Sequence, residues 1–160
     1  MNGITRIGVA VGSLILASVA IAQAPPPPTP EQKADAAVLT RQGLFKVQVF
    51  AFGPASGAMR GGPFDAPAIV KAAQRVQVTA GMIAEAFAAD THTTSKLKTR
   101  AREGIWTNKA DFDSKANDLV KAAAELEAAA KTGDKDKTID AAKGVGKGCS
   151  GCHDQFRDNP

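Results

Sequence analysis

The alternating spacing of apolar residues is the feature that most constrains how this chain folds. Between positions 69 and 87 these residues fall at intervals of 4, 3, 4, 3 and 4. The same intervals recur over 112–130, and the alternation of 3 and 4 continues over 139–156. Such spacing places the apolar side chains on one face of a helix, whereas a half-buried strand would carry them at every second position. The expected inward positions are Ile69, Ala73, Val76, Ala80, Ile83 and Phe87, then Phe112, Ala116, Leu119, Ala123, Leu126 and Ala130, then Ile139, Ala142, Gly146, Cys149, His153 and Phe156.

Residues with known preferences for helix ends divide the chain into four helices. The first begins at Thr29-Pro30-Glu31, where a capping hydroxyl precedes a proline suited to the first turn. Asp65 and Asp134 begin the second and fourth helices, and Thr132-Gly133 ends the third. Mostly short links then predict an all-α, antiparallel four-helix bundle. The expected inward face of the first helix consists of Val38, Phe45, Val49 and Phe52.

The N-terminus has the pattern of an export signal. Arg6 precedes a mostly apolar run over 7–21, which is too short and too lightly flanked for a permanent membrane span. We expect cleavage after Ala22, since cleavage after Ala24 would place Pro25 first in the mature chain. Residues 1–22 are thus a predicted signal peptide, 23–30 a proline-rich linker and 31–160 a single domain.

Charge and composition exclude several classes of function. Lys and Arg number 20 against 16 Asp and Glu, and they are scattered rather than gathered in blocks. The chain therefore lacks the basic stripe of a nucleic-acid-binding protein. It also shows no catalytic triad, no phosphate-binding loop and no paired carboxylates, so we do not expect an enzyme.

Both cysteines of the chain lie in one motif, Cys149-Ser150-Gly151-Cys152-His153. On a helix the two cysteines and His153 share one face, because they are separated by three and four residues. This C-x-x-C-H pattern is the signature of covalent c-type haem attachment. Two thiols one turn apart add to the two vinyl groups of the porphyrin, and the histidine ligates the iron. We therefore expect one haem c in the bundle core.

Other uses of the motif fit the sequence less well. A zinc site would need a fourth donor, and His92 is the only other histidine in the chain. A thioredoxin-like redox pair would need a βαβ setting. A plain interaction bundle with a disulfide between the two cysteines remains an alternative, although it leaves His153 unexplained.

Four segments carry a resemblance to a known family, and the last of them is specific while the others support it in the correct order: "TRQGLF", "GGPFD", "GIWTNKADF" and "CSGCHDQFR". Through them the chain resembles the cytochrome c′ family, including its c-556 relatives. The resemblance implies a periplasmic protein without a membrane anchor once the signal is removed. It also implies a homodimer formed through the first two helices, and small redox proteins as partners. Cys149 and Cys152 would be the thioether anchors, and His153 the proximal iron ligand.

The resemblance also implies further haem-binding residues. Arg41 and Gln42 match the pair that contacts the haem propionates, and arginine suits carboxylates chemically. Arg157 matches the basic residue near the proximal face of the haem. Trp106 looks like an aromatic residue at the haem edge, although core packing would explain it equally well.

Phe45 matches the residue that faces the sixth coordination site of the iron in this family. Phenylalanine cannot ligate iron, so the resemblance implies a five-coordinate haem behind a crowded, apolar pocket. Such a pocket, expected to have no hydrogen-bond donor, favours nitric oxide first and carbon monoxide next. The alternative is a six-coordinate, low-spin electron carrier of the c-556 kind, in which Met59 or Met82 supplies the sixth ligand.

Overall fold

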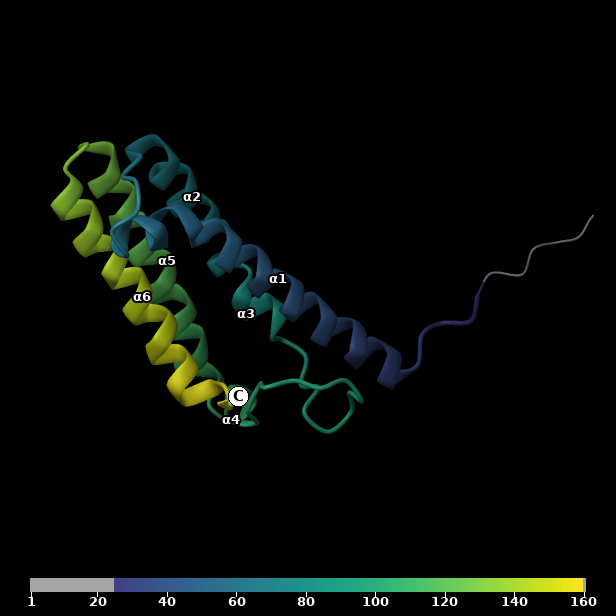
Figure 1. Cartoon of the computed structure of the whole chain (residues 1–160). Coiled ribbons are helices and arrows are strands. Elements are labelled where there is room, and N and C mark those ends of the chain that lie inside the picture. Colours follow the sequence, from purple (N-terminus) through teal and green to yellow (C-terminus); the bar gives the residue numbers. More distant parts are fainter. Residues whose placement is uncertain (1–24, 160) are drawn as a thin grey trace, which may run out of the picture.

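Four long helices form most of the computed structural model, which describes residues 25–159 (Figure 1). Two single-turn helices lie between the second and third long ones, and no strand occurs in this part of the chain. The predicted all-α four-helix bundle is confirmed. The predicted signal peptide lies outside the described residues. The helices are α1 (Pro30–Met59), α2 (Ala66–Gly81), α3 (Ile83–Ala86), α4 (Gly104–Thr107), α5 (Lys109–Lys131) and α6 (Lys135–Phe156).

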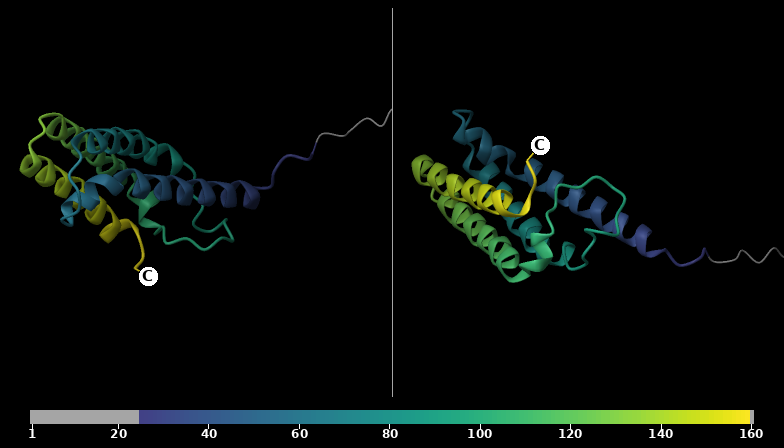
Figure 2. Two further views of the ribbon diagram at one scale, coloured as in Figure 1. Left: turned by 45° about the horizontal axis from the view of Figure 1, so that its top comes forward. Right: turned by 90° about the horizontal axis from the view of Figure 1, so that it is seen from below.

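The long helices are packed unequally. α5 and α6 form an antiparallel pair, α2 packs along α5, and α1 packs along α2 (Figures 1 and 2). α1 and α6 contact each other much less, and they diverge toward the end of the bundle where α6 terminates (Figure 1). Among the helices of residues 25–159, none has the length and apolar character needed to cross a membrane.

The predicted helix starts are capped as the sequence indicates. At the start of α1, the Thr29 hydroxyl accepts from the Gln32 amide at 3.2 Å, and the Gln32 side chain accepts from the Thr29 amide at 2.8 Å. Asp65 and Asp134 accept from backbone amides of α2 and α6, each at 3.0 Å. These bonds satisfy amides that have no partner within their own helix.

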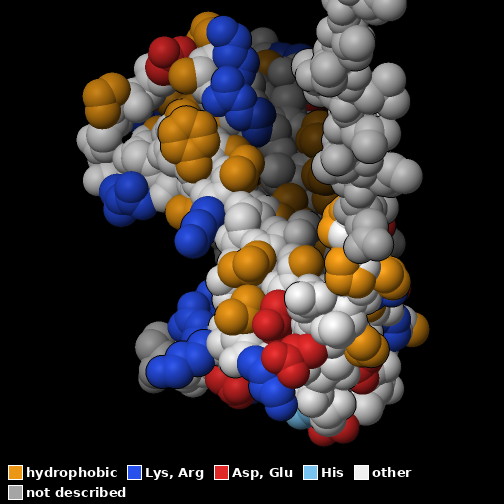
Figure 3. All heavy atoms as spheres, turned by 90° about the vertical axis from the view of Figure 1, so that its right-hand side faces the viewer, with side chains coloured by type: hydrophobic (Ala, Val, Ile, Leu, Met, Phe, Trp, Pro, Cys, Tyr) orange, Lys and Arg blue, Asp and Glu red, His pale blue; other side chains and the backbone are white. Residues whose placement is uncertain are grey.

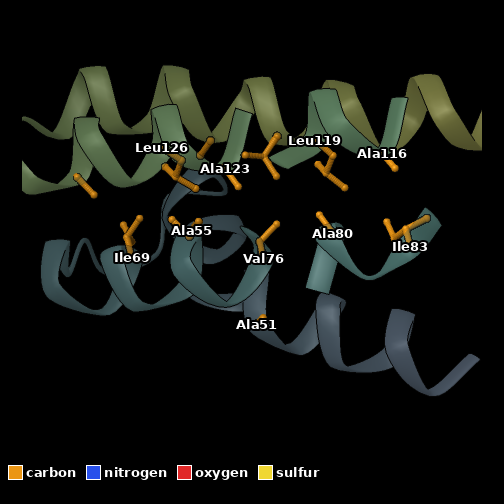
Figure 4. Packing of buried hydrophobic residues seen from close by; sticks show 14 of the residues in the cluster. Ala51, Ala55, Ile69, Val76, Ala80, Ile83, Ala116, Leu119, Ala123 and Leu126 are labelled. Atoms are coloured by element: carbon orange, nitrogen blue, oxygen red, sulfur yellow. The ribbon is translucent and has the colours of Figure 1, made fainter. Parts of the chain in front are cut away.

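The core lies between α2 and α5. All twelve predicted inward positions of the second and third helical segments are buried. Figure 4 shows Ile69, Val76 and Ile83 directed toward the α5 side chains Leu126, Ala123, Leu119 and Ala116. The alanines let the two backbones approach closely, while the larger side chains fill the space between them.

The predicted inward face of α1 is partly wrong. Val49 is 76% exposed and Phe52 is only half-buried, so neither packs in the core, although both border a cavity next to Cys149 and His153. Most core positions of α1 are taken by alanines and polar side chains, which a search for large apolar residues does not find. α6 shows a smaller shift of the same kind, with Thr138 and Val145 more buried than the predicted positions beside them. The buried residues of α1 are Ala34, Val38, Arg41, Gln48, Ala51, Ala55 and Ala58.

A carboxylate on α5 joins it to α2. Glu127 accepts hydrogen bonds from Gln74 at 2.9 Å and Gln77 at 2.6 Å, and it pairs with Lys131 at 2.7 Å. The Lys131 bond and then the two glutamine bonds lower the pKa of Glu127 from 4.5 to about 2. The ionised form is therefore the one that the folded protein stabilises.

Replacing Glu127 should weaken the bundle in a pH-dependent way. A carboxylate with a lowered pKa contributes stability above its unfolded pKa and loses that contribution as the pH falls through its folded pKa. Glu127→Gln should therefore unfold at lower urea concentration than the parent near neutral pH. The difference should shrink between about pH 5 and about pH 2. Urea titrations of both proteins, followed by circular dichroism across this pH range, measure the difference in stability. A difference that does not change with pH would contradict a stabilising role for the ionised carboxylate.

Candidate haem-binding site

The cysteine and histidine motif occupies the last two turns of α6, where this helix faces α1 across the open end of the bundle. Cys149, Cys152 and His153 are each half-buried, and both cysteines are free thiols. Burial raises the pKa of both thiols, which keeps them protonated near neutral pH. The structure thus brings the three predicted residues together on one side of α6.

Two adjoining cavities lie against the motif. The smaller has a volume of about 150 Å³ and is bordered by both cysteines and by His153. The larger has a volume of about 820 Å³ and is bordered by Cys152 and His153. The larger volume lies within the range of about 300–1,000 Å³ that is typical of small-molecule and cofactor sites. Phe45 of α1 borders both cavities.

The surroundings of His153 favour a neutral imidazole. Burial lowers its pKa, and the positive charges of Arg157 and Arg100 lower it further. A neutral imidazole has a free ring nitrogen, which is the form that ligates a metal. Arg157 caps α6 through its backbone amide, which donates to the His153 carbonyl at 3.1 Å.

Arg41 is held inside the protein rather than on its surface. It is 4% exposed, and its guanidinium donates to the Ala86 carbonyl at 2.7 Å, the Ala89 carbonyl at 2.7 Å and the Thr91 hydroxyl at 2.6 Å. It also lies over the ring of Phe87, 4.5 Å from the centroid. Burial lowers its pKa, although an arginine stays charged at any physiological pH. Arg41 therefore fastens the segment after α3 to α1.

The other predicted haem contacts lie near this segment. Gln42 is exposed and donates to the Lys98 carbonyl at 2.9 Å. The Trp106 indole donates to the Phe87 and Ala89 carbonyls at 3.0 and 3.1 Å. Trp106 is thus occupied by the segment after α3, and it is not among the residues that border the larger cavity.

Basic side chains surround the larger cavity, and aromatic rings form its floor. The cations suit the two carboxylates of a haem, while the rings suit its apolar macrocycle. Phe112 is central to the floor, with ring centroids 5.0 Å from Phe87 and 5.2 Å from Phe156. Figure 3 shows Lys and Arg side chains above and below an indentation on one face of the molecule. The basic residues that border the cavity are Arg41, Lys46, Lys98, Arg100 and Arg157.

The two candidate methionine ligands lie elsewhere. Met82 is 50% exposed at the end of α2. The Met59 methyl group lies 3.9 Å from where a Cβ on Gly146 would stand, two helical turns before His153 on α6. Neither methionine borders either cavity.

The sequence prediction missed two residues that matter at the site. Gln48 is buried and borders the smaller cavity, and Thr91 is the buried acceptor for Arg41. The helical spacing 38, 41, 45, 48 would have found Gln48 if polar residues had been admitted to the inward face. No local pattern marks Thr91, since its contact joins residues 50 positions apart.

These features together define a c-type cytochrome of the four-helix-bundle class, with the attachment motif in its last helix. Comparison with known proteins specifies the family. Residues 36–157 match the family model described as Cytochrome C′. The chain is 33% identical over 126 residues to a cytochrome c′ of Cereibacter sphaeroides, which covers 78% of this chain and 84% of the relative. The chain belongs to the cytochrome c′ family, and its cofactor is covalently bound haem c.

Solved structures agree with this assignment. Cytochrome c prime from Shewanella frigidimarina is 34% identical, with a TM-score of 0.71, and covers 79% of this chain and 97% of its own. A nitric oxide complex of a variant of cytochrome c prime from Alcaligenes xylosoxidans is 29% identical, with a TM-score of 0.69 and the same coverages. The likeness therefore extends over almost the whole length of each solved chain.

Removing Arg41 should loosen the wall of the site. Arg41→Ala leaves two carbonyls and the Thr91 hydroxyl without their donor, so we expect the protein to lose about 3 kcal/mol of unfolding free energy. Arg41→Lys should lose less unfolding free energy than Arg41→Ala, because an ammonium can still donate to some of the acceptors. It should not match the parent, because it lacks the fork geometry that reaches all three. Urea unfolding of the holoprotein measures both changes. A loss below about 0.5 kcal/mol for Arg41→Ala, typical of a surface change, would contradict this.

Proposed function

We propose that this chain is a gas-binding haem protein whose iron is five-coordinate, with His153 as proximal ligand and nitric oxide as the main ligand. The observation that carries the proposal is Phe45, which faces the motif from the opposite helix and cannot ligate iron. The positions of Met59 and Met82, away from both cavities, do not favour a six-coordinate electron carrier.

The remaining predicted residues fit this proposal as supports of the haem. Cys149 and Cys152 would form the thioethers, and Arg157 would keep His153 neutral through its charge. Arg41 and Gln42 would face the propionates, as Arg41 borders the larger cavity while already bonded to the segment after α3. Electron exchange with small redox proteins would accompany gas binding, and no step requires enzymatic turnover.

Substitution of Phe45 tests the open iron site. Optical spectra of the ferrous parent should be high-spin and should change on adding nitric oxide or carbon monoxide. Phe45→Ala should speed carbon monoxide association, because it removes a ring that borders both cavities and would crowd the open position of the iron. Phe45→Met should give sharp, low-spin bands, because a thioether then faces the sixth position.

Phe52→Ala is a suitable control for these measurements. It removes the same ring two turns along α1, from the wall of the smaller cavity only. Its association rate should change less than that of Phe45→Ala. Low-spin bands in the parent, indifferent to carbon monoxide, would instead indicate a sixth protein ligand and would refute the proposal.

We also propose that two copies of the chain associate through α1 and α2 in the periplasm. Hydrophobic side chains reach the surface among charged ones (Figure 3), and the large exposed ones of the described residues lie on these helices or just after α2. Positions 39, 47 and 50 follow one stripe of α1, and positions 78 and 82 are one turn apart. The stripe consists of Leu39, Val47, Phe50, Val78 and Met82, which are 59%, 54%, 75%, 67% and 50% exposed.

A charge placed on this stripe should separate the copies. Phe50→Asp adds a carboxylate that an apolar interface would have to desolvate, so the variant should sediment as a monomer while the parent sediments as a dimer. Lys121→Asp on α5 makes a charge change away from the stripe and should remain dimeric. Sedimentation velocity distinguishes the two states, and a monomeric parent would rule the dimer out.

A further inference from the structure

Gln48 is a buried polar residue without a partner for its carbonyl oxygen. Its side chain is 7% exposed, and Oε1 makes no hydrogen bond within the described chain. It stands on α1 one turn after Phe45 and borders the smaller cavity together with Cys149 and His153. Buried amides in proteins are nearly always hydrogen-bonded. Because the oxygen is enclosed by protein, only the nitrogen end of this amide can reach a molecule in the cavity that the residue borders.

The position of Gln48 determines which partner is possible. His153 and both cysteines come from α6, whereas Gln48 and Phe45 come from α1 on the other wall. A macrocycle attached to α6 would be held from that wall by the cysteines and His153, and Gln48 would approach it from the wall that α1 forms. The propionates do not need this amide, because the cations around the larger cavity are available to them.

Ser56 and Lys115 are the other residues of the smaller cavity, besides the attachment motif, that carry polar side chains. The remaining lining is apolar and includes Phe52, Val76, Ile83, Leu119 and Val145. In such surroundings a hydrogen bond is stronger than it is in water.

We propose that Gln48 donates a hydrogen bond to the small ligand held at the open haem position and thereby determines which diatomic molecules are retained. This inference rests on the proposed function. The enclosed, unpaired atom of Gln48 is its oxygen, so the amide nitrogen, which carries two N–H donors, is the end left to face the cavity. A ligand whose outer atom gains negative charge on ferrous iron is stabilised by that donor. The pocket is then not the donor-free one that the sequence suggested.

The test compares the parent with Gln48→Leu in their ferrous carbon monoxide complexes. A donor next to the ligand lowers its C–O stretching frequency, so infrared spectra should show a higher frequency in Gln48→Leu. Nitric oxide should dissociate roughly 2- to 10-fold faster from the variant, the factor expected for one neutral hydrogen bond. The variant should fold, since leucine is of similar size and removes an unpaired buried amide.

Phe52→Leu is the control, because it alters the volume of the same cavity without removing a polar group. An unchanged C–O frequency in Gln48→Leu would overturn the inference and leave Gln48 a packing residue. A shift of equal size in Phe52→Leu would overturn it as well, since cavity volume would then be the cause. A ferrous parent that does not bind carbon monoxide would overturn both this inference and the proposed function. If the parent binds carbon monoxide but Gln48→Leu leaves the C–O frequency unchanged, the role of Gln48 is refuted while the proposed gas binding stands.

Discussion

The close packing of α2 against α5 is the interaction on which the rest of the structure depends. Small buried residues on both helices let the two backbones lie close together; they are Ala73 and Ala80 on α2 and Ala116 and Ala123 on α5. Figure 4 shows Ala80 directed toward α5. α6 then pairs with α5 and α1 with α2, so these outer helices are fixed from one side only. Their divergence at the end of α6 accompanies the two cavities that border the attachment motif. The cofactor site is therefore a consequence of unequal packing within one bundle.

The sequence predicts the buried face of a helix well only where the inward residues are apolar. The α2 and α5 faces were predicted residue by residue, because nearly all their inward positions carry alanine or larger apolar side chains. On α1 the inward positions include Arg41 and Gln48, so a search for apolar residues moved the expected face toward Val49. The buried polar residues that misled the prediction are those that border the cavities beside the attachment motif. A polar residue at a regular inward position is thus a useful sign of a site.

The attachment motif was predictable for a different reason. Attachment of one haem requires two cysteines for the thioethers and a histidine for the iron at fixed helical spacing. A short stretch of sequence therefore contains the whole motif. The segment after α3 carries no comparable local pattern. Its course depends on bonds from Arg41 to Ala86, Ala89 and Thr91, which lie 45 to 50 residues further along the chain. Long-range contacts of this kind follow from the packing of α1 and α2, and no local spacing reveals them.

The two walls of the site are subject to different constraints. α6 must supply the anchors and the proximal imidazole, so its chemistry is fixed by the cofactor. The attachment chemistry does not require particular residues on α1. Its positions 41, 45 and 48 carry a buried cation, an aromatic ring and an amide on successive turns. Under the proposals above, these three residues would act on different properties of the site, namely its wall, its steric access and its polarity. Because all three lie on one rigid helix, a change at one of them leaves the attachment chemistry on α6 intact. Ligand preference can therefore vary through α1 while haem attachment is retained.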